Sequence, residues 1–352
     1  MSNNRVFYAC MRAGIAPNGS TSYTTIRGLQ SIAMTTTFNL TQAFEIGQLA
    51  IYENIEGIPD VQATLEKVLD GTPPVYTLAT QGGTSASLTG RSAAKCQLAI
   101  GIYDETDNSA TGAASTAVVL SGLYVNSVSY AASVNDNGTE SVTLVGNNKT
   151  WVGGTTITWA DDPFASNNDT PPGDGGVSQR ENVIFGADGS TLPTEIPGIN
   201  GSGKNIDSST GHGAHIQSIT ASTNLGREDA FELGTREEYY KYATFPTEVT
   251  TEFVILATSG DMISATAAGI YTETGTCANG YNLTNQTIYL KFCEGLQIDL
   301  GTKNKLASIG QRGGDAGGGN VEITYTYSNF NDFIVYHSGD PNYETEGWNP
   351  DE

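Results

Sequence analysis

Apolar and polar residues alternate in short runs along most of the chain, a pattern typical of β-strands with one buried face. In the run 30–47, Ile32, Met34, Thr36 and Phe38 fall on one side, which predicts a long strand. Further strands are predicted at 5–13, 60–70, 95–103, 122–134, 140–146, 181–185, 246–261, 286–292, 305–311, 320–328 and 331–338. Turn residues at 135–138 join two of these strands as a hairpin, and only 87–94 has the pattern of a short helix.

The chain contains one of its own segments twice. QAFEIGQLAIYENIEGIP (42–59) returns as DAFELGTREEYYKYATFP (229–246), at the 187-residue offset that separates Phe44 from Phe231. The order of predicted strands is also the same before and after 161–179, a segment rich in Pro and Asp. We therefore predict a domain at 1–160, a linker at 161–179 and a second copy of that domain, with an acidic tail, at 180–352.

The residues common to both copies are of types that maintain a fold. Phe lies two positions before Ile or Leu, so both share one face of a strand. Gly permits a bend, and Pro suits the entry of the next strand. The Glu points the other way, and we expect it to meet a partner such as a cation of a neighbouring subunit. These candidate packing or inter-subunit residues are Phe44, Glu45, Gly47, Pro59, Phe231, Glu232, Gly234 and Pro246.

The net charge of the chain limits which classes of molecule it could bind. The 38 acidic and 16 basic side chains give a formal net charge of −22. A polyanion such as nucleic acid would be repelled, which excludes a protein that grips it tightly. The acidity either only keeps the protein soluble or also provides a surface along which DNA passes without adhering. The sequence leaves both interpretations open.

Candidate chemistry is sparse. His212 and His215 have a spacing that metal sites use, but their loop is rich in Gly and Ser and has no thiolate, so we predict a polar loop instead. Cys277 and Cys293 flank a possible hairpin, where a disulfide stays open as an alternative to reduced thiols. No phosphate-binding loop, nucleophile elbow, zinc-protease or EF-hand motif is present. We predict no enzymatic activity, no cofactor, no bound metal, no secretory signal and no membrane span.

The repeated segments resemble the tail tube proteins, or major tail proteins, of tailed bacteriophages. The resemblance rests on Gln-Ser-Ile at 30–32 and 217–219, on Phe-Glu-Ile/Leu-Gly at 44–47 and 231–234, and on the Pro-led strands that follow. It implies tandem β-sandwich or barrel-like domains, usually with one short flanking helix each, although neither half shows a clear segment for that helix. Tail tube proteins assemble as stacked rings, and the resemblance also implies a long loop that reaches from one ring to the next. Residues 186–215 are our candidate for this loop.

Six such domains would form a ring, so the resemblance implies three two-domain chains per ring and stacked rings that make a hollow tube. Partners would be further copies of the chain and other tail proteins: the terminator, the baseplate or tip, the tape measure and, in contractile tails, a sheath. DNA would pass through the lumen without specific binding, past an acidic wall. The protein would belong to the virion tail, assembled in the cytoplasm of a host bacterium.

Other functions stay open. A tail terminator or a capsid decoration protein could share this composition, and a terminator would form one ring and stop. A glycan-binding adhesive β-protein would show aromatic clusters beside acidic loops. The tyrosines at 239, 240 and 242 instead lie inside the repeated segment.

Overall fold

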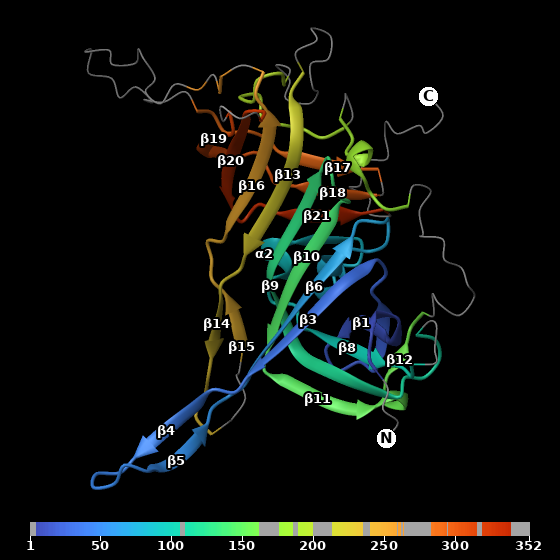
Figure 1. Ribbon diagram of the computed structural model, residues 1–352, viewed down its shortest axis with the longest axis vertical. Coiled ribbons are helices and arrows are strands. Elements are labelled where there is room, and N and C mark those ends of the chain that lie inside the picture. The colour runs from blue at the N-terminus through green and yellow to red at the C-terminus, as the bar shows by residue number, and fades with distance from the viewer. Residues whose placement is uncertain are drawn as a thin grey trace. The chain divides into compact units, whose positions relative to one another are not determined.

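A computed structural model describes residues 5–105, 110–161, 176–185, 189–199, 213–234, 240–258, 260–261, 263, 283–293, 295–314 and 319–338. Strands dominate these residues, so the predicted mainly-β fold is confirmed. The chain divides into two compact units, and both halves of the sequence contribute to each of them (Figure 1). Unit 1 comprises Met1–Val128, Thr139–Gly176 and Asn224–Phe245; unit 2 comprises Ser129–Gly138, Val177–Thr223 and Pro246–Glu352.

Unit 1 contains most of the strands. They are β1 (Met11–Pro17), β2 (Ser22–Thr25), β3 (Leu29–Thr37), β4 (Leu40–Phe44), β5 (Ile51–Glu56), β6 (Asp60–Val68), β7 (Ser85–Ser87), β8 (Cys96–Ile102), β9 (Thr116–Ser133) up to Val128, β10 (Thr139–Gly146), β11 (Asn148–Gly153), β12 (Thr158–Trp159), β14 (Arg227–Ala230) and β15 (Tyr240–Ala243). Its helices are α1 (Val75–Ala79), α2 (Leu88–Arg91) and the 3₁₀ turns η1 (Tyr8–Cys10) and η2 (Gly154–Thr156).

Unit 2 has fewer described elements. Besides the last residues of β9 it contains η3 (Arg180–Asn182), β13 (His215–Asn224), β16 (Glu248–Leu256), β17 (Tyr289–Phe292), β18 (Leu296–Asp299), β19 (Lys305–Arg312), β20 (Glu322–Phe330) and β21 (Ile334–His337). Strand β16 lies between β13 and β20, and β20 pairs with β19, all antiparallel. Strand β18 lies between β17 and β21.

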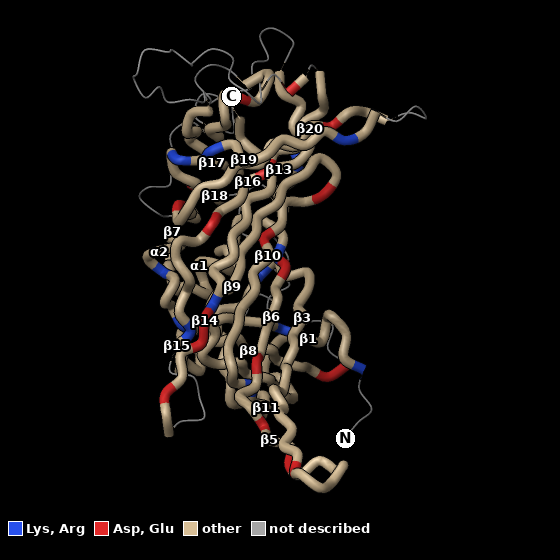
Figure 2. Tube along the Cα trace, turned by 90° about the vertical axis from the view of Figure 1, so that its left-hand side faces the viewer, with Lys and Arg blue, Asp and Glu red and all other residues tan. Residues whose placement is uncertain are grey.

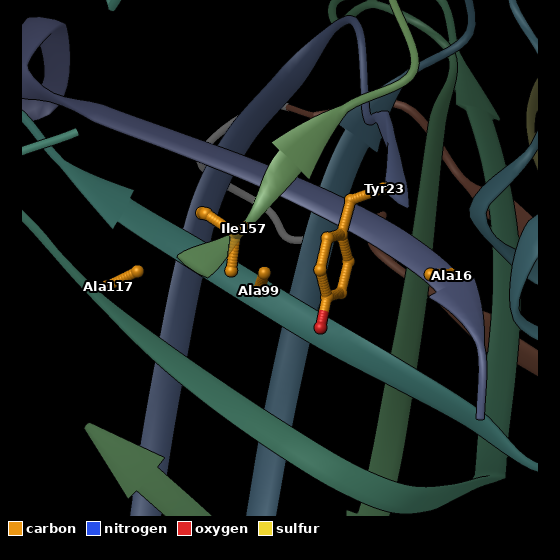
Figure 3. Close-up of a cluster of buried hydrophobic side chains, with 5 residues drawn as sticks. All are labelled: Ala16, Tyr23, Ala99, Ala117 and Ile157. Atoms are coloured by element: carbon orange, nitrogen blue, oxygen red, sulfur yellow. The ribbon is translucent and has the colours of Figure 1, made fainter. Parts of the chain in front are cut away.

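One part of the core of unit 1 packs small residues around an aromatic ring. Tyr23 and Ile157 lie against three alanines of β1, β8 and β9 (Figure 3). Trp159 packs against this cluster and against the guanidinium of the buried Arg12, which lies 4.4 Å from the Trp159 ring. The Arg12 Nε donates to Thr25 Oγ1 at 3.0 Å, so the buried cation keeps a polar partner.

Buried rings dominate the sheet of unit 2. Phe253 of β16 meets Tyr327 of β20 edge to face, at a centroid distance of 5.9 Å. Tyr130, at the end of β9, stacks on Phe333. Each buried residue alternates with a partly exposed one along β20, the pattern of a strand that covers a core with one face only.

Several predicted strand limits are wrong. The strand predicted at 5–13 begins only at Met11, because its partner β8 ends opposite that residue and η1 precedes it. The strand predicted at 30–47 breaks at 38–39 into β3 and β4, where Asn39 Nδ2 donates to the carboxylate of Asp60. Strands β2 and β18 were not predicted.

The two α-helices both come from the first half of the sequence, and the helical start predicted at 87–94 corresponds to α2. The backbone amides of Val75 and Tyr76 at the start of α1 donate to the buried carboxylate of Glu140, at 2.7 and 2.9 Å. These amides would otherwise lack acceptors, so Glu140 of β10 fixes α1 against the sheet. A flanking helix in the second half is absent from the described residues.

Candidate assembly surfaces

The repeated sequence has a structural counterpart in each unit. Strand β6 lies between β3 and β10, just as β16 lies between β13 and β20. The β3 and β6 pairing shifts register between Leu29 and Ser31, and the β13 and β16 pairing shifts between Ile216 and Ser218. These irregularities fall at equivalent positions under the 187-residue offset, so even the β-bulge occurs in both copies. We call β3, β6, β10 and β9 the first block, and β13, β16, β20 and β19 the second block.

Each repeat also carries a two-stranded hairpin that follows its first long strand. We call β4 with β5 arm 1, and β14 with β15 arm 2; both belong to unit 1. Gly47 and Gly234 at the two tips have φ of 107° and 94°, a backbone region that other residues enter only with strain. This explains the repeated glycine. Pro59 directly precedes β6, and Pro246 lies two residues before the start of β16.

The other signature residues lie on these arms. Phe44 and Phe231 are 65% and 60% exposed, so neither contributes to the core of the chain itself. Glu45 accepts a hydrogen bond from Gln48 Nε2 at 2.6 Å within the tip, and Glu232 is exposed. A role of these residues in contacts between subunits stays a prediction.

Arm 2 is held on unit 1 by a cation and several rings. The guanidinium of Arg227 donates from Nε and Nη2 to the carbonyl oxygen of Val125, at 2.8 and 2.6 Å. It also lies over the ring of Tyr124, which meets Tyr240 of β15 at a centroid distance of 5.4 Å. Burial lowers the pKa of Arg227, while the planar donor fork stays well suited to two-point binding of a carbonyl. Lys241 pairs with Asp229 across arm 2 at 2.6 Å.

Arm 1 lacks the residues of this anchor. Leu40 occupies the position of Arg227, Glu53 that of Tyr240, and Asn54 that of Lys241. Nearly every residue of β4 and all of β5 are exposed, and the arm projects away from the sheet (Figure 1). Its exposed large apolar side chains, with those flanking it, are Phe38, Leu40, Phe44, Ile46, Leu49, Ile51, Tyr52 and Ile55. So much exposed apolar surface on one hairpin is typical of an interaction site.

Two long strands have an open edge. Strand β3 pairs with β6, and β19 pairs with β20; neither has a second neighbour among the described strands. Open edges present unpaired backbone amides and carbonyls, which bind further strands. The open edges therefore lie at the first strand of the first block and the last strand of the second block.

The face of each block that points away from its core is rich in hydroxyls. On β3, β6 and β10 of the first block this face carries Ser31, Ala33, Thr35, Thr37, Asp60, Gln62, Thr64, Glu66, Ser141, Thr143 and Val145. On the four strands of the second block it carries Ser218, Thr220, Ser222, Glu248, Thr250, Glu252, Val254, Glu322, Thr324, Thr326, Ser328, Lys305, Ser308, Gly310 and Arg312. Its charged residues are five carboxylates and, on β19, the cations Lys305 and Arg312, while most positions along these strands are tan in Figure 2.

A cavity of about 290 Å³ lies in unit 1 between the base of arm 1 and the tip-side end of β14. Asn39, Ile58, Asp60, Asn147, Asp229 and Phe231 line it. Asp229 is paired with Lys241, and Asp60 accepts from Asn39, so both carboxylates are already compensated. The lining contains neither a histidine nor a thiol, and it offers no pair of groups for acid–base or nucleophilic catalysis.

Some predicted features lie outside the described residues: His212, Cys277 and most of the loop 186–215. Within the described residues, no group of His, Cys, Asp and Glu could hold a metal ion. None of the described helices has the length and apolarity that a membrane span requires. Arg227, Tyr124 and the contrast between the arms were missed from the sequence, although the replacement of Leu40 by Arg at the equivalent position 227 was a readable signal.

Comparison with known proteins gives no family assignment. No protein-family model matches the chain, and no curated protein matches its sequence. The anti-feeding prophage baseplate, solved with six-fold symmetry, includes a chain of 15% identity, with coverage of 44% of this chain and 98% of that chain and a TM-score of 0.33. A chain of the anti-feeding prophage tube-terminating cap has 11% identity, coverage of 44% and 94%, and a TM-score of 0.32. At these TM-scores neither likeness is evidence for a shared function.

Proposed function

We propose that the protein is a structural subunit of a phage-type tail tube, in which three chains form a ring of six blocks and the rings stack into a hollow conduit for DNA. The observation that carries this proposal is the arrangement of the two blocks. Each block is a row of four strands, the last strand of the first block neighbours the first strand of the second, and the two outer strands have open edges.

The pairing of β9 with β13 is the pattern that we propose for every contact between blocks. Strand β9 neighbours β13. In unit 1 the Leu225 amide donates to the carbonyl oxygen of Asn126 at 2.7 Å, and in unit 2 the Val134 amide donates to that of Gln217 at 3.0 Å. Residue numbers rise along one strand as they fall along the other, so the two strands run antiparallel. Because β19 is the equivalent of β9, and β3 that of β13, the same junction would form between β19 of one chain and β3 of the next.

Repetition of this junction around a ring pairs the edges of every β3 and β19, which is the stable outcome for a head-to-tail contact. Closure with six blocks then needs three chains, the number that the resemblance to tail tube proteins implies. The chain would thereby contribute two of six quasi-equivalent positions, which accounts for the internal repeat.

In this ring the hydroxyl-rich face would line the lumen. That face has five carboxylates, those of Asp60, Glu66, Glu248, Glu252 and Glu322, and two cations on β19, Lys305 and Arg312, of which Arg312 pairs with Glu322. DNA would slide because carboxylates outnumber cations on this wall, so its phosphates would meet a net repulsion.

The partners in this proposal are further copies of the chain and the other tail proteins of the virion, with assembly in the cytoplasm of a host bacterium. The chain would act as a wall and not as an enzyme, and it would need no cofactor.

Negative-stain electron microscopy of the purified protein at rising concentration tests the proposal. Hollow tubes of uniform width are expected. Single rings that never stack would replace the tube subunit by a terminator, and compact particles at every concentration would contradict assembly through open edges.

A further inference from the structure

The two arms are equivalent in the repeat but have different surroundings. Arm 2 is seated on unit 1 beside the stretch of β9 that contains Tyr124 and Val125. Within the described part of the chain arm 1 has no such seat: β4 and β5 are exposed almost throughout. If β19 replaces β9 in the junction between chains, the equivalent seat for arm 1 is the beginning of β19 in a second copy of the chain.

The charges at the two places are complementary. The segment 38–59 contains Glu45, Glu53 and Glu56 and no Lys or Arg. The beginning of β19 has Lys303 and Lys305, both exposed. Leu40 pairs with Glu56 at the base of arm 1, so this carboxylate lies at the end of the arm nearest β3, while Glu53 pairs with Ala43 three residues nearer the tip. The base is the end of the arm that would face β19 of the next chain.

The sequence differences between the arms fit this exchange of partners. In arm 2, Arg227 and Tyr240 bind an aromatic ring and a backbone carbonyl. At the equivalent positions arm 1 has Leu40 and Glu53, which suit an aliphatic lysine stem and its ammonium group. The exposed apolar residues of arm 1 would be buried in the same contact.

We propose that arm 1 binds a second copy of this chain, at the beginning of its β19, through apolar contacts and through pairing of Glu53 and Glu56 with Lys303 and Lys305. This inference rests on the proposed ring and adds to it the residues that select the next subunit. Arm 2 packs beside the pairing of β9 with β13 inside a chain, and arm 1 would pack beside the equivalent pairing of β19 with β3 between chains.

Charge reversal tests the pairing. The double variant Glu53→Lys/Glu56→Lys is expected to raise the concentration needed for assembly at least about tenfold, because like charges then face each other across the contact. Lys303→Glu/Lys305→Glu should do the same, and the combination of all four substitutions should restore assembly. As a matched control, Arg180→Glu with Glu181→Lys reverses an exposed ion pair on η3 and should leave assembly unchanged. Thermal unfolding of each variant checks that it folds.

Zero-length cross-linking identifies the contact directly. Tubes assembled from equal amounts of ¹⁵N-labelled and unlabelled chains should give Glu53 or Glu56 joined to Lys303 or Lys305 in mixed-label peptides, which only a contact between chains can produce. Tubes that form but join these glutamates only within one chain or only to other lysines would overturn the inference and leave the tube function standing. A failure of the wild-type protein to assemble would overturn both.

Discussion

At the scale of single residues, the stability of unit 1 depends on charged groups that are buried with partners. Glu140 is fully buried, accepts two amides of α1 and lies opposite Lys67 in the pairing of β10 with β6. Lys67 is itself buried and pairs with Asp70. A buried charge that loses its partner is costly, so these side chains restrict what the positions tolerate.

Replacement of Glu140 by Gln should lower the free energy of unfolding by about 2–4 kcal/mol, because two buried amides of α1 lose their charged acceptor. Urea unfolding measures the loss. The control is Glu66→Gln on the exposed face of β6, where the carboxylate accepts from Ser31 Oγ and the expected loss is below about 1 kcal/mol. Equal losses in the two variants would contradict a role of Glu140 in fixing α1.

A second prediction concerns Cys96 and the dependence of the free energy of unfolding on pH. Burial raises the pKa of this thiol from 9.0 to about 12. The unfolded chain therefore loses this proton at lower pH than the folded chain, so the stability that Cys96 contributes is complete below pH 9 and is lost as the pH rises above it. Between pH 9 and 10 the free energy of unfolding should fall with a slope that approaches about 1.4 kcal/mol per pH unit for this group.

The variant Cys96→Ala should have a smaller slope over the same interval, whatever its absolute stability. The raised pKa values of the buried tyrosines, such as Tyr76, add to the slope mainly above pH 10. An unchanged slope between pH 9 and 10 in the variant would show that Cys96 does not titrate differently in the folded and unfolded chains.

Residue-level roles were only partly predictable. The repeated Gly47 and Gly234 indicated a bend, and both have positive φ. Alternation alone could not show that Phe44 is exposed, because a pattern gives the face of a strand but not whether another layer covers it. Likewise, Glu140 falls on the buried face of β10, in phase with Val142 and Leu144, but only the tertiary contact with α1 reveals why a carboxylate is tolerated there.

At the scale of elements, the two arms are the feature that extends beyond the two blocks of strands. Arm 1 has apolar residues on a hairpin that the described residues of its own chain leave exposed. An isolated two-stranded hairpin is only marginally stable, so we expect arm 1 to become ordered fully when it is bound.

The double variant Phe44→Ser/Ile55→Ser should therefore fold with almost unchanged stability and assemble poorly, because both side chains are exposed in the single chain. Calorimetry measures the first expectation, and sedimentation velocity the second. Tyr8→Ser, which removes an exposed ring far from the arms in sequence, serves as the control. A large loss of thermal stability with normal assembly would mean that arm 1 packs inside its own chain.

Most elements could be predicted, but their limits and pairing could not. The strands around β6 and β16 follow from alternation, and their equivalence follows from the repeat. The start of β1 depends on the length of its partner β8, and the break after β3 depends on Asn39 contacts with residues near Asp60. Both are long-range effects that local sequence does not contain.

At the scale of the whole molecule, the repeat and the open edges together specify which strands would join in a ring. Each unit contains residues from both halves of the sequence, an exchange that the sequence alone did not reveal. The composition indicated many strands and turns, but the position of the open edges follows only from the order of strands in the sheet.

The central claim is that β19 of one chain joins β3 of the next in a ring of three. Cryo-electron microscopy of assembled protein, reconstructed without imposed symmetry, tests it most directly. The account predicts three chains per ring, pseudo-six-fold related blocks, and Lys305 of one chain beside the end of β3 in its neighbour. A ring with six chains, or a ring in which β3 and β19 both face solvent, would contradict it.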